Sequence, residues 1–533
     1  MNDSKGSVSS QFARSALVLA MAMVLSQLIG LLSKSLIGSI YGASAEVDAF
    51  LASNRLTETL FNLVAGGALG SAFVPAFSAL LDRGDNRDAW KLASNVANII
   101  CAILIFLCVL GFLFAPQIVR YILVPGFSLN DPTLQHLTVK LLRIQLPSVV
   151  IFGLSGLIMG ILNANQHFLL PGLAPAMYQF GIMIGVLFLS KPLGIEGLAF
   201  GALCGSFMHF FVQLPQIIKL REKQFHFSFG WKDPKVRNVI RLMIPRQIGA
   251  SAVQLNFLVN NYIASYMAAG SISALSWGLS LMLMPQAAIA QSVATVSLPL
   301  FSVQAARGDF SEMRSALAST LRLVLFLAIP ASAGLIIFGD PVVRLIFERH
   351  AFTTEMTKMV SWALIWYGTG LVGHCIVEVV SRAFYAMQDT KTPVMILFCA
   401  MILNMGMSIG LASLFQSFGW QEHGGLALAN SIATALEMTA LLFFMRRKLH
   451  GLEGKRIWHA VIMNLIAAII MGGIMRIWLS VARNLPLIAI VLAGVLVAIA
   501  VYGFVCWMMK LDEVYLIRRI FRKEKIIPDT RKS

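Results

Sequence analysis

The chain has 533 residues, of which 58% are hydrophobic and only 13% are charged, and its mean hydropathy is +0.77. Soluble domains carry about 25% charged residues, so this composition excludes a soluble protein and indicates an integral membrane protein. The net charge of +17 does not indicate nucleic acid binding, because the basic residues lie in short segments between apolar runs, where membrane topology uses them.

Apolar runs along the chain predict fourteen membrane-spanning helices. A helical crossing needs about 20 mostly apolar residues. The first such run is too long for the core of a signal peptide, so we interpret it as a retained span. By this criterion we expect spans near residues 15–40, 47–81, 89–115, 137–163, 169–190, 196–221, 236–268, 271–303, 312–338, 355–387, 392–417, 424–447, 457–480 and 485–509.

The distribution of basic residues predicts the orientation of these helices. An even number of spans places both termini on one side of the membrane. Most of the 42 lysine and arginine residues lie on that side, including those within 446–448 and 518–525. Positive charge collects on the cytoplasmic side of membrane proteins. Both termini are therefore predicted to be cytoplasmic.

A long-period repeat divides the predicted helices into two halves. Residues 75–85 read Pro-Ala-Phe-Ser, four residues, and Arg-Gly-Asp, while residues 299–309 read Pro-Leu-Phe-Ser, four residues, and Arg-Gly-Asp. A second echo pairs Phe127 with Phe352. The offset covers six spans, an even number, so the two copies point the same way through the membrane. Parallel repeats of this kind occur in transporters whose substrate site lies between the halves.

The predicted architecture is an all-α polytopic membrane protein. We expect two six-helix lobes related by the parallel repeat, followed by two additional transmembrane helices that have no counterpart in it. The predicted boundaries are an N-terminal lobe at 1–222, a C-terminal lobe at 223–450, the two extra helices at 451–510 and a basic cytoplasmic tail at 511–533.

Charged residues lie inside several of the apolar spans. A charge at the bilayer centre costs about 2.5–3.5 kcal/mol on insertion scales, so such residues are expected to face a wet cavity or one another. Two near span ends, Arg322 and Arg382, are explained by snorkelling to the interface, and Glu378 can pair with Arg382 at i, i+4. The full set is Lys34, Arg55, Arg143, Arg246, Arg322 and Arg382, with Asp48, Glu58, Glu378 and Glu437.

Four residues form the candidate substrate-binding site: Lys34, Asp48, Arg55 and Arg246. We expect them to line a cationic, water-filled cavity for an anionic head group, because arginine can bind phosphate through two parallel hydrogen bonds. Asp48 would position one of the bases. The alternative is internal ion pairing of Arg55 with Asp48 or Glu58. Asp48 and Arg55 are two helical turns apart and share a helix face.

The sequence carries no enzyme signature. It has no Walker loop, no His-Glu-x-x-His, no Gly-x-Ser-x-Gly and no dinucleotide fingerprint after a strand. We therefore predict a transporter rather than an enzyme, with no cofactor and no nucleic acid partner. No metal site is predicted. Asn404 in the eleventh span is a polar candidate for an ion site, although no carboxylate lies near it in that span.

Several motifs spread over most of the chain resemble the MurJ (MviN) lipid II flippase family. They are Val47-Asp48-Ala49-Phe50-Leu51, Gly67-Ala68-Leu69 with Ala72-Phe73-Val74-Pro75, Ile161-Leu162-Asn163-Ala164, Pro171-Gly-Leu-Ala-Pro175, Val212-Gln213-Leu214-Pro215, and Arg382-Ala-Phe384-Tyr385-Ala386 with Asp389-Thr390-Lys391-Thr392-Pro393. The resemblance implies two six-helix lobes of the multidrug/oligosaccharidyl-lipid/polysaccharide exporter (MOP) superfamily, with two further helices forming a groove for a polyprenyl tail.

The resemblance also implies an activity in cell-wall biogenesis and cell shape. Members of this family move the undecaprenyl-diphosphate-linked peptidoglycan precursor, lipid II, across the bacterial cytoplasmic (inner) membrane. The implied mechanism is alternating access, driven by the membrane potential or by a sodium or proton gradient and not by ATP. The implied partners are the lipid-linked substrate, membrane lipid and cell-wall synthesis proteins.

The chain departs from the family in its charged pattern. Where the family carries Ser-Arg-x-x-Gly-x-x-Arg-Asp in the first span, this chain has Ser26-Gln27 and, at the end of the stretch, Ser33-Lys34. A family arginine and glutamate in span two are replaced by Phe61 and Gly66, and an Asp-Arg pair in span eight by Leu279-Ser280. Two alternatives to lipid II transport follow: export of another lipid-linked glycan or amphiphile, or a non-transporting paralogue that scaffolds cell-envelope enzymes.

Overall fold

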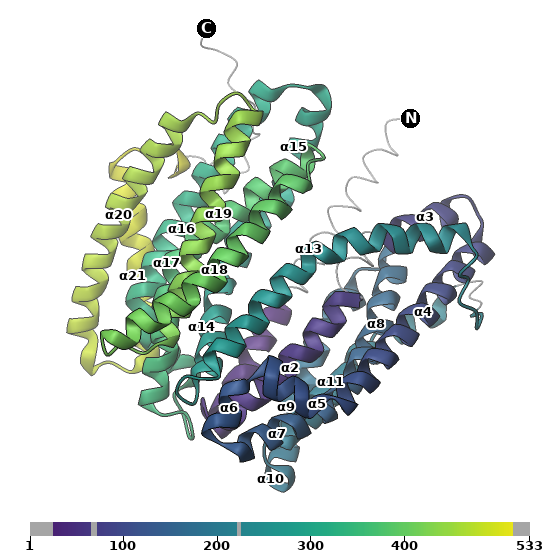
Figure 1. The fold of residues 1–533 in the computed structure, drawn as a ribbon. Helices are drawn as coiled ribbons and strands as arrows, with labels where there is room; N and C mark the ends of the chain where they lie inside the picture. The colour runs from purple at the N-terminus through teal and green to yellow at the C-terminus, as the bar shows by residue number, and fades with distance from the viewer. Residues whose placement is uncertain (1–24, 65–71, 221–224, 515–533) are drawn as a thin grey trace. The chain divides into compact units, whose positions relative to one another are not determined.

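A computed structural model of the chain describes residues 25–64, 72–220 and 225–514 (Figure 1). The secondary structure of these residues is helical, with no strand among them. The chain divides into two compact units. One consists of Met1–Ala274 with Phe347–Met356, and the other of Leu275–Ile346 with Thr357–Ser533. The all-α fold predicted from the sequence is confirmed.

The first unit begins, in its described part, with a helical segment at residues 25–41. Its long helices form the bundle in which the candidate site lies, and short turns connect them. The elements are α2 (Ala45–Val64), α3 (Val74–Asp82), α4 (Asn86–Leu113), α5 (Ala115–Ile118), η2 (Val119–Leu123), α6 (Pro125–Asn130), α7 (Pro132–Gln145), α8 (Pro147–Ala164), α9 (Leu169–Ile184), η3 (Gly185–Leu189), α10 (Ser190–Leu193), α11 (Glu196–Phe211), α12 (Leu214–Lys219) and α13 (Pro234–Ala264).

The second unit is entered within α14 (Ser271–Gln286), because the boundary between the units falls after Ala274. Its helices are mostly longer than those of the first unit. They are η4 (Ala287–Gln291), α15 (Ser292–Arg307), α16 (Phe310–Phe347), α17 (Thr354–Ala386), α18 (Lys391–Ser417), α19 (His423–Lys448), α20 (Gly454–Val481), η5 (Ala482–Asn484) and α21 (Leu487–Met508).

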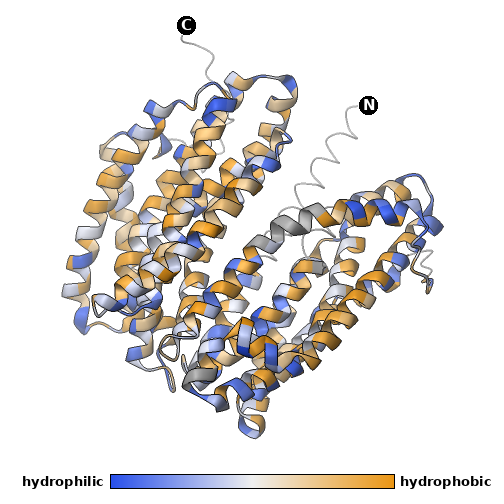
Figure 2. Ribbon diagram, in the orientation of Figure 1, coloured by the Kyte–Doolittle hydropathy of each residue, from blue (hydrophilic) through white to orange (hydrophobic). Residues whose placement is uncertain are grey.

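Eleven helices within the described residues are long and apolar enough to cross a membrane. They agree with eleven of the fourteen expected spans, those from residue 89 onward except the span expected at 236–268. Figure 2 shows orange, hydrophobic residues along most of their length and blue, hydrophilic residues collected at the ends and connections. A hydrophobic stretch with polar ends is what the bilayer selects in a spanning helix.

The other three expected spans are not among these eleven helices, each for its own reason. The spans at 15–40 and 47–81 fall partly outside the described residues, which begin at 25 and exclude 65–71. The span at 236–268 corresponds to α13, which is long enough but is not among the eleven apolar helices. Its second half carries the amides Gln254, Asn256, Asn260 and Asn261, which lower its hydropathy. Hydrophobicity alone therefore does not identify this helix as a crossing.

The repeated sequence forms the same local structure in both copies. Gly84 after α3 and Gly308 after α15 both adopt left-handed backbone angles, with φ of +79° and +69°. In each copy the following aspartate amide bonds back to a carbonyl in the last turn, Asp85 to Leu80 at 3.0 Å and Asp309 to Gln304 at 3.1 Å. This is the Schellman ending, which favours glycine because a side chain strains the left-handed conformation. Its recurrence supports an internal duplication.

Glycines bring α9 and the adjoining η3 into backbone contact with α11 in the first unit. A methyl group placed on Gly181 would lie 2.1 Å from the Cα of Gly205, and one on Gly185 would lie 2.7 Å from the Cα of Gly201. No side chain fits at these positions. Membrane helices pack closely through small residues in this way, because lipid supplies no hydrophobic force to drive them together.

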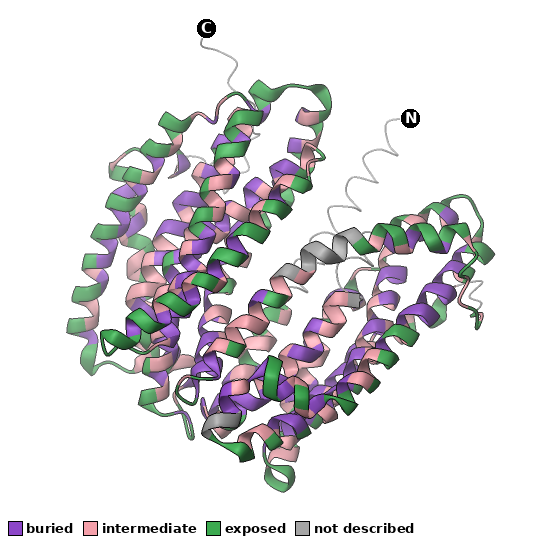
Figure 3. Cartoon of the chain, in the orientation of Figure 1, coloured by how far each residue is buried: buried purple, intermediate pink, exposed green. Residues whose placement is uncertain are grey.

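Polar contacts within the second unit fasten the last two helices to α16. The Tyr502 hydroxyl of α21 lies 2.9 Å from both the Phe326 carbonyl oxygen of α16 and the Asn464 amide oxygen of α20. Figure 3 shows that α20 and α21 also present many exposed residues. Among these Ile469 is 72% and Val481 75% exposed. Such apolar exposure on long helices is expected where lipid is the solvent.

Two of the sequence interpretations concern arginines of this unit. Arg382 pairs with Glu378 at 2.7 Å, which confirms the predicted i, i+4 contact. Arg322, which was expected to snorkel to the interface, forms ion pairs that the sequence did not indicate. Its guanidinium pairs with Glu513 at 2.6 Å and Asp512 at 2.9 Å, just beyond α21. The acidic partners were missed because about 190 residues separate them from Arg322.

Candidate functional site

Asp48 occupies a buried position in the first turn of α2, with 2% of its surface exposed. Its Oδ1 accepts hydrogen bonds from the backbone amide and hydroxyl of Ser273, at 2.7 and 2.5 Å, and its Oδ2 accepts one from the Gly270 amide at 2.7 Å. Asp48 therefore caps the N-terminus of α14, where free amides and the positive end of the helix dipole stabilise an anion.

The expectation that Asp48 positions a basic residue of the cavity is consequently wrong. Both carboxylate oxygens are committed to the start of α14, and the described residues show no ion pair between Asp48 and Arg55. The two residues do lie on the same helix, seven positions apart, as expected. The sequence did not indicate the actual partners because they follow Asp48 by more than 220 residues.

Arg55 is the centre of a polar cluster in the first unit. Its Nη1 donates to Glu58 Oε2 at 2.9 Å, and the Asn54 amide donates to Glu58 Oε1 at 3.0 Å. The Tyr178 hydroxyl of α9 donates to Asn54 Oδ1 at 2.9 Å. The guanidinium lies 4.5 Å from the ring centroid of Phe257 on α13, a cation–π contact. The ion pairing considered for Arg55 from the sequence thus occurs with Glu58.

Arg55 and Glu58 remain partly accessible, with 25% and 40% of their side chains exposed. Lys34, on the helical segment at 25–41, is half-buried, and its charge interacts with those of Glu58 and Arg55. The cluster of Lys34, Arg55 and Glu58 holds two positive charges and one negative charge, so it is cationic. Lys34 and Arg55 therefore lie close enough for their charges to interact.

Arg246 belongs to α13, but its side chain lies outside the described residues. The glycines Gly66, Gly67 and Gly70 of the family motif also lie outside them. The structure therefore gives no account of these positions.

The amides of α13 are buried polar groups that the sequence analysis did not single out. Gln254 Oε1, Asn256 Oδ1, Asn260 Oδ1 and Asn261 Nδ2 are buried atoms with no hydrogen-bond partner among the described residues. The helix that carries them packs against α2 and supplies Phe257 to Arg55. Buried polar groups without protein partners usually bind water or a ligand. The four amides in the otherwise apolar second half of α13 were the sequence signal that could have indicated these buried polar groups.

A second buried polar group lies between α8 and α11. The Ser155 hydroxyl lies 2.6 Å from His209 Nδ1, and Gln213 Nε2 donates to Ser155 Oγ at 2.8 Å. All three residues are fully or almost fully buried. These hydrogen bonds join the two helices, and Gln213 Oε1 is the atom of the three side chains that has no hydrogen-bond partner among the described residues.

Asn404, the candidate ion ligand, lies in α18 of the second unit and is 2% exposed. Its Oδ1 accepts a hydrogen bond from Ser408 at 3.2 Å, one helical turn away, while its Nδ2 has no partner in the described part of the chain. Within those same residues no group of three or more His, Cys, Asp or Glu side chains is arranged to hold a metal ion.

Comparison with known proteins identifies the family. The family model described as "Lipid II flippase MurJ" matches residues 37–497, most of the chain. The chain belongs to the MurJ family. Among curated MurJ relatives, a probable lipid II flippase MurJ of Vibrio cholerae is 30% identical over 89% of this chain and 91% of its own length. The lipid II flippase MurJ of Burkholderia cenocepacia is 28% identical over 95% of this chain and 99% of its own.

Solved structures agree with membership of the MurJ family. A structure of lipid II flippase MurJ in an inward closed conformation superposes with a TM-score of 0.78, at 27% identity, covering 94% of this chain and all of that one. An inward-facing multidrug resistance MATE transporter of the MOP superfamily matches with a TM-score of 0.66 at 13% identity over 82% of this chain. The second likeness concerns the fold alone. Both support the MOP-type architecture implied by the sequence motifs.

Proposed function

We propose that this chain is a flippase that moves lipid II, the undecaprenyl-diphosphate-linked peptidoglycan precursor, across the membrane. The observation that carries the proposal is the match to the MurJ family over residues 37–497, together with the 0.78 TM-score to a solved MurJ structure. The eleven apolar helices support a function within the bilayer, and the cationic cluster of Lys34, Arg55 and Glu58 offers a site for an anionic head group.

In this proposal Lys34 and Arg55 bind the diphosphate, and Arg246 is a third candidate base. Each hydrogen bond to a charged group contributes about 1.5–3 kcal/mol. Glu58 Oε2 accepts one hydrogen bond from Arg55 Nη1 at 2.9 Å, which leaves the other N–H groups of the guanidinium for phosphate oxygens. Asp48 caps the start of α14 and is therefore not proposed as a substrate ligand. The unpartnered α13 amides suit the hydroxyl and amide groups of the sugar and peptide.

The replaced family positions favour a second candidate, transport of another lipid-linked glycan. Ser26-Gln27, Leu279 and Ser280 carry no charge where the family pattern has arginine or aspartate. Lysine at position 34 supplies a point charge and cannot form the two-pronged contact of an arginine with phosphate. A site with fewer arginines would bind a diphosphate less tightly, so a less charged head group fits it better.

The proposal extends to location and energy source. The abundance of basic residues in the loops on the side of the termini supports a bacterial inner-membrane protein with both ends in the cytoplasm. Alternating access would be driven by the membrane potential or by a sodium or proton gradient, with Asn404 as the candidate ion ligand. Cell-wall synthesis proteins are the proposed protein partners.

Complementation of a strain depleted of its own lipid II flippase tests the proposal. We expect the wild-type gene to restore growth, Arg55→Ala and Lys34→Ala to abolish rescue, and Arg83→Ala to retain it. Arg83 is an exposed arginine in the loop after α3, so it controls for loss of positive charge alone. Membrane levels of each variant are compared by immunoblot.

Two outcomes would contradict parts of the proposal. Rescue that survives both Arg55→Ala and Lys34→Ala would refute the site. Failure of the wild-type chain to rescue, with no accumulation of lipid II when its own gene is deleted, would refute lipid II as the cargo. The second result would favour another lipid-linked glycan, and a non-transporting scaffold if no lipid-linked intermediate accumulates.

A further inference from the structure

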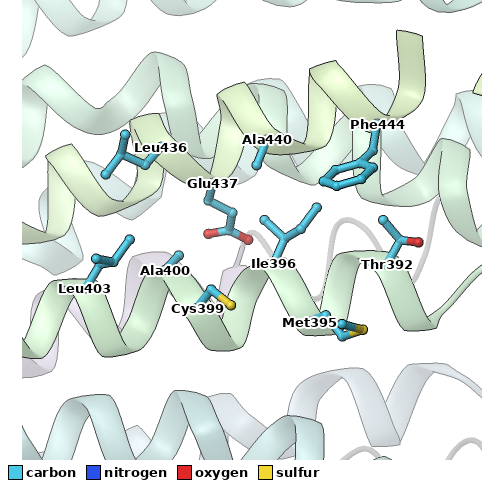
Figure 4. Close-up of a pocket in the computed structure, with 10 residues that line it drawn as sticks. All are labelled: Thr392, Met395, Ile396, Cys399, Ala400, Leu403, Leu436, Glu437, Ala440 and Phe444. Atoms are coloured by element: carbon cyan, nitrogen blue, oxygen red, sulfur yellow. The ribbon is translucent and has the colours of Figure 1, made fainter. Parts of the chain in front are cut away.

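A groove between α18 and α19 holds an acidic residue that the proposed function does not use. Its volume is about 390 Å³, within the range of small-molecule sites. Figure 4 shows the Glu437 carboxylate pointing from α19 toward α18, between Ile396 and Cys399. All residues that line the groove belong to the second unit, whereas Arg55 and its cluster belong to the first.

The lining of this groove is almost entirely hydrocarbon. Besides Glu437, its only oxygen-bearing side chain is that of Thr392, whose hydroxyl already donates to Asp389 at 2.8 Å. Met395 is 68%, Leu403 47% and Leu436 46% exposed, so the groove opens on the outer face of this helix pair. A ligand entering it would meet one acidic group on an apolar surface.

The carboxylate of Glu437 forms no hydrogen bond and no ion pair with any residue that the structure describes, whereas Glu378 nearby is paired with Arg382. Tyr385 of α17 lies within electrostatic reach of Glu437 but carries no positive charge. Acidic groups inside membrane helices are normally paired, and an unpaired one marks a functional site.

The position of Glu437 along its helix excludes a contact with lipid head groups. It follows His423, the first residue of α19, by 14 residues and precedes Lys448, the last, by 11. At 1.5 Å per residue these separations are about 21 Å and 16 Å. Glu437 therefore lies near the middle of the helix, where the environment is hydrocarbon and head groups do not reach.

We propose that this groove binds an amphiphilic monocation whose positive charge pairs with Glu437 and whose hydrocarbon body lies along α18 and α19. A hydrated metal ion does not suit the groove, because hard cations need several oxygen ligands and Glu437 is the only uncommitted one here. A lipophilic ammonium compound matches both features, the single acid and the apolar walls. The proposal is independent of lipid II transport.

Binding of decyltrimethylammonium to the purified full-length chain, followed by native mass spectrometry, tests this proposal. We expect one binding event that Glu437→Gln weakens at least tenfold, equivalent to about 1.4 kcal/mol. The Glu422→Gln variant should bind decyltrimethylammonium as the wild type does, because Glu422 precedes the first residue of α19 and lies 15 residues from Glu437. The uncharged 1-decanol, with the same tail, should bind the wild type weakly.

A second variant separates the charge from the shape of the site. Ala440→Phe fills the groove beside Glu437 without altering the carboxylate, so it should also abolish binding. The melting temperature of each variant checks that it folds. Equal binding of decyltrimethylammonium and decanol to the wild type would overturn the proposal, since the acid would then be neutralised by a proton. Unchanged binding in Glu437→Gln, or in Ala440→Phe, would overturn it as well.

Discussion

Removal of the Asp48 carboxylate should loosen the start of α14. In the variant Asp48→Ala the amides of Gly270 and Ser273 and the Ser273 hydroxyl lose their acceptor. Hydrogen bonds between membrane helices contribute about 0.6 kcal/mol on average and up to about 1.7 kcal/mol. Three of them therefore contribute about 2–5 kcal/mol. Asp48→Asn keeps one acceptor oxygen and should lose roughly half as much.

Hydrogen–deuterium exchange at the two amides measures this loss directly. A decrease of 2 kcal/mol in the free energy of local opening accelerates exchange by about 30-fold, since each 1.4 kcal/mol is a factor of ten. We expect Asp48→Ala to show at least this acceleration at Gly270 and Ser273, with Asp48→Asn between it and the wild type. Glu46→Gln is the matched control, because Glu46 lies in the same helical turn but is exposed.

The reasoning about Asp48 would be refuted by unchanged exchange at Gly270 and Ser273 in Asp48→Ala. It would also be refuted if Glu46→Gln accelerated exchange equally. That result would mean that negative charge near the start of α2 matters in general and that the hydrogen bonds of Asp48 do not.

Three further changes have expected outcomes. Gly181→Ala should destabilise the detergent-solubilised chain by about 2 kcal/mol or more, because its methyl group has no space against the facing helix; Gly410→Ala, where a methyl group meets nothing within 4 Å, should leave the melting temperature unchanged or raise it. Arg322→Ala should cost about 3–5 kcal/mol by leaving the almost fully buried Glu513 unpaired, and protease should then cleave sooner beyond α21. Burial alone would raise the pKa of Asp389, but hydrogen bonds from Lys448 and Thr392 lower it to about 2. Its stabilising contribution is therefore complete above its unfolded pKa near 3.8 and lost as the pH falls toward 2. The melting-temperature loss caused by Asp389→Asn should accordingly be equal at pH 5 and pH 8, and a loss confined to pH 8 would contradict this.

The membrane spans were predictable because the bilayer imposes a simple requirement on each helix by itself. Length and hydropathy located eleven of them without any knowledge of their neighbours. The same criterion fails for α13, whose unpartnered amides make it polar. A helix that lines a polar site violates the rule that identifies its neighbours, so the departure itself indicates function.

The candidate site divides into contacts that sequence spacing can reveal and contacts that it cannot. Arg55 and Glu58 are three residues apart on one helix, and Glu378 and Arg382 are four apart, so both pairs follow from helix geometry. The partners of Asp48 lie more than 220 residues along the chain. Such a contact depends on tertiary packing, which the spacing of residues along a single sequence does not specify.

The glycine contact between α9 and α11 also bears on the polar cluster. A methyl group on Gly205 would lie 2.4 Å from the backbone carbonyl oxygen of Tyr178. The hydroxyl at the tip of the Tyr178 side chain donates a hydrogen bond to Asn54. Asn54 in turn holds Glu58, the ion-pair partner of Arg55. The close approach of the two helix backbones at Gly205 therefore also positions Tyr178 and, through it, the side chains that hold Arg55. Any residue larger than glycine at position 205 would displace Tyr178 and weaken this support of Arg55 without replacing a polar residue.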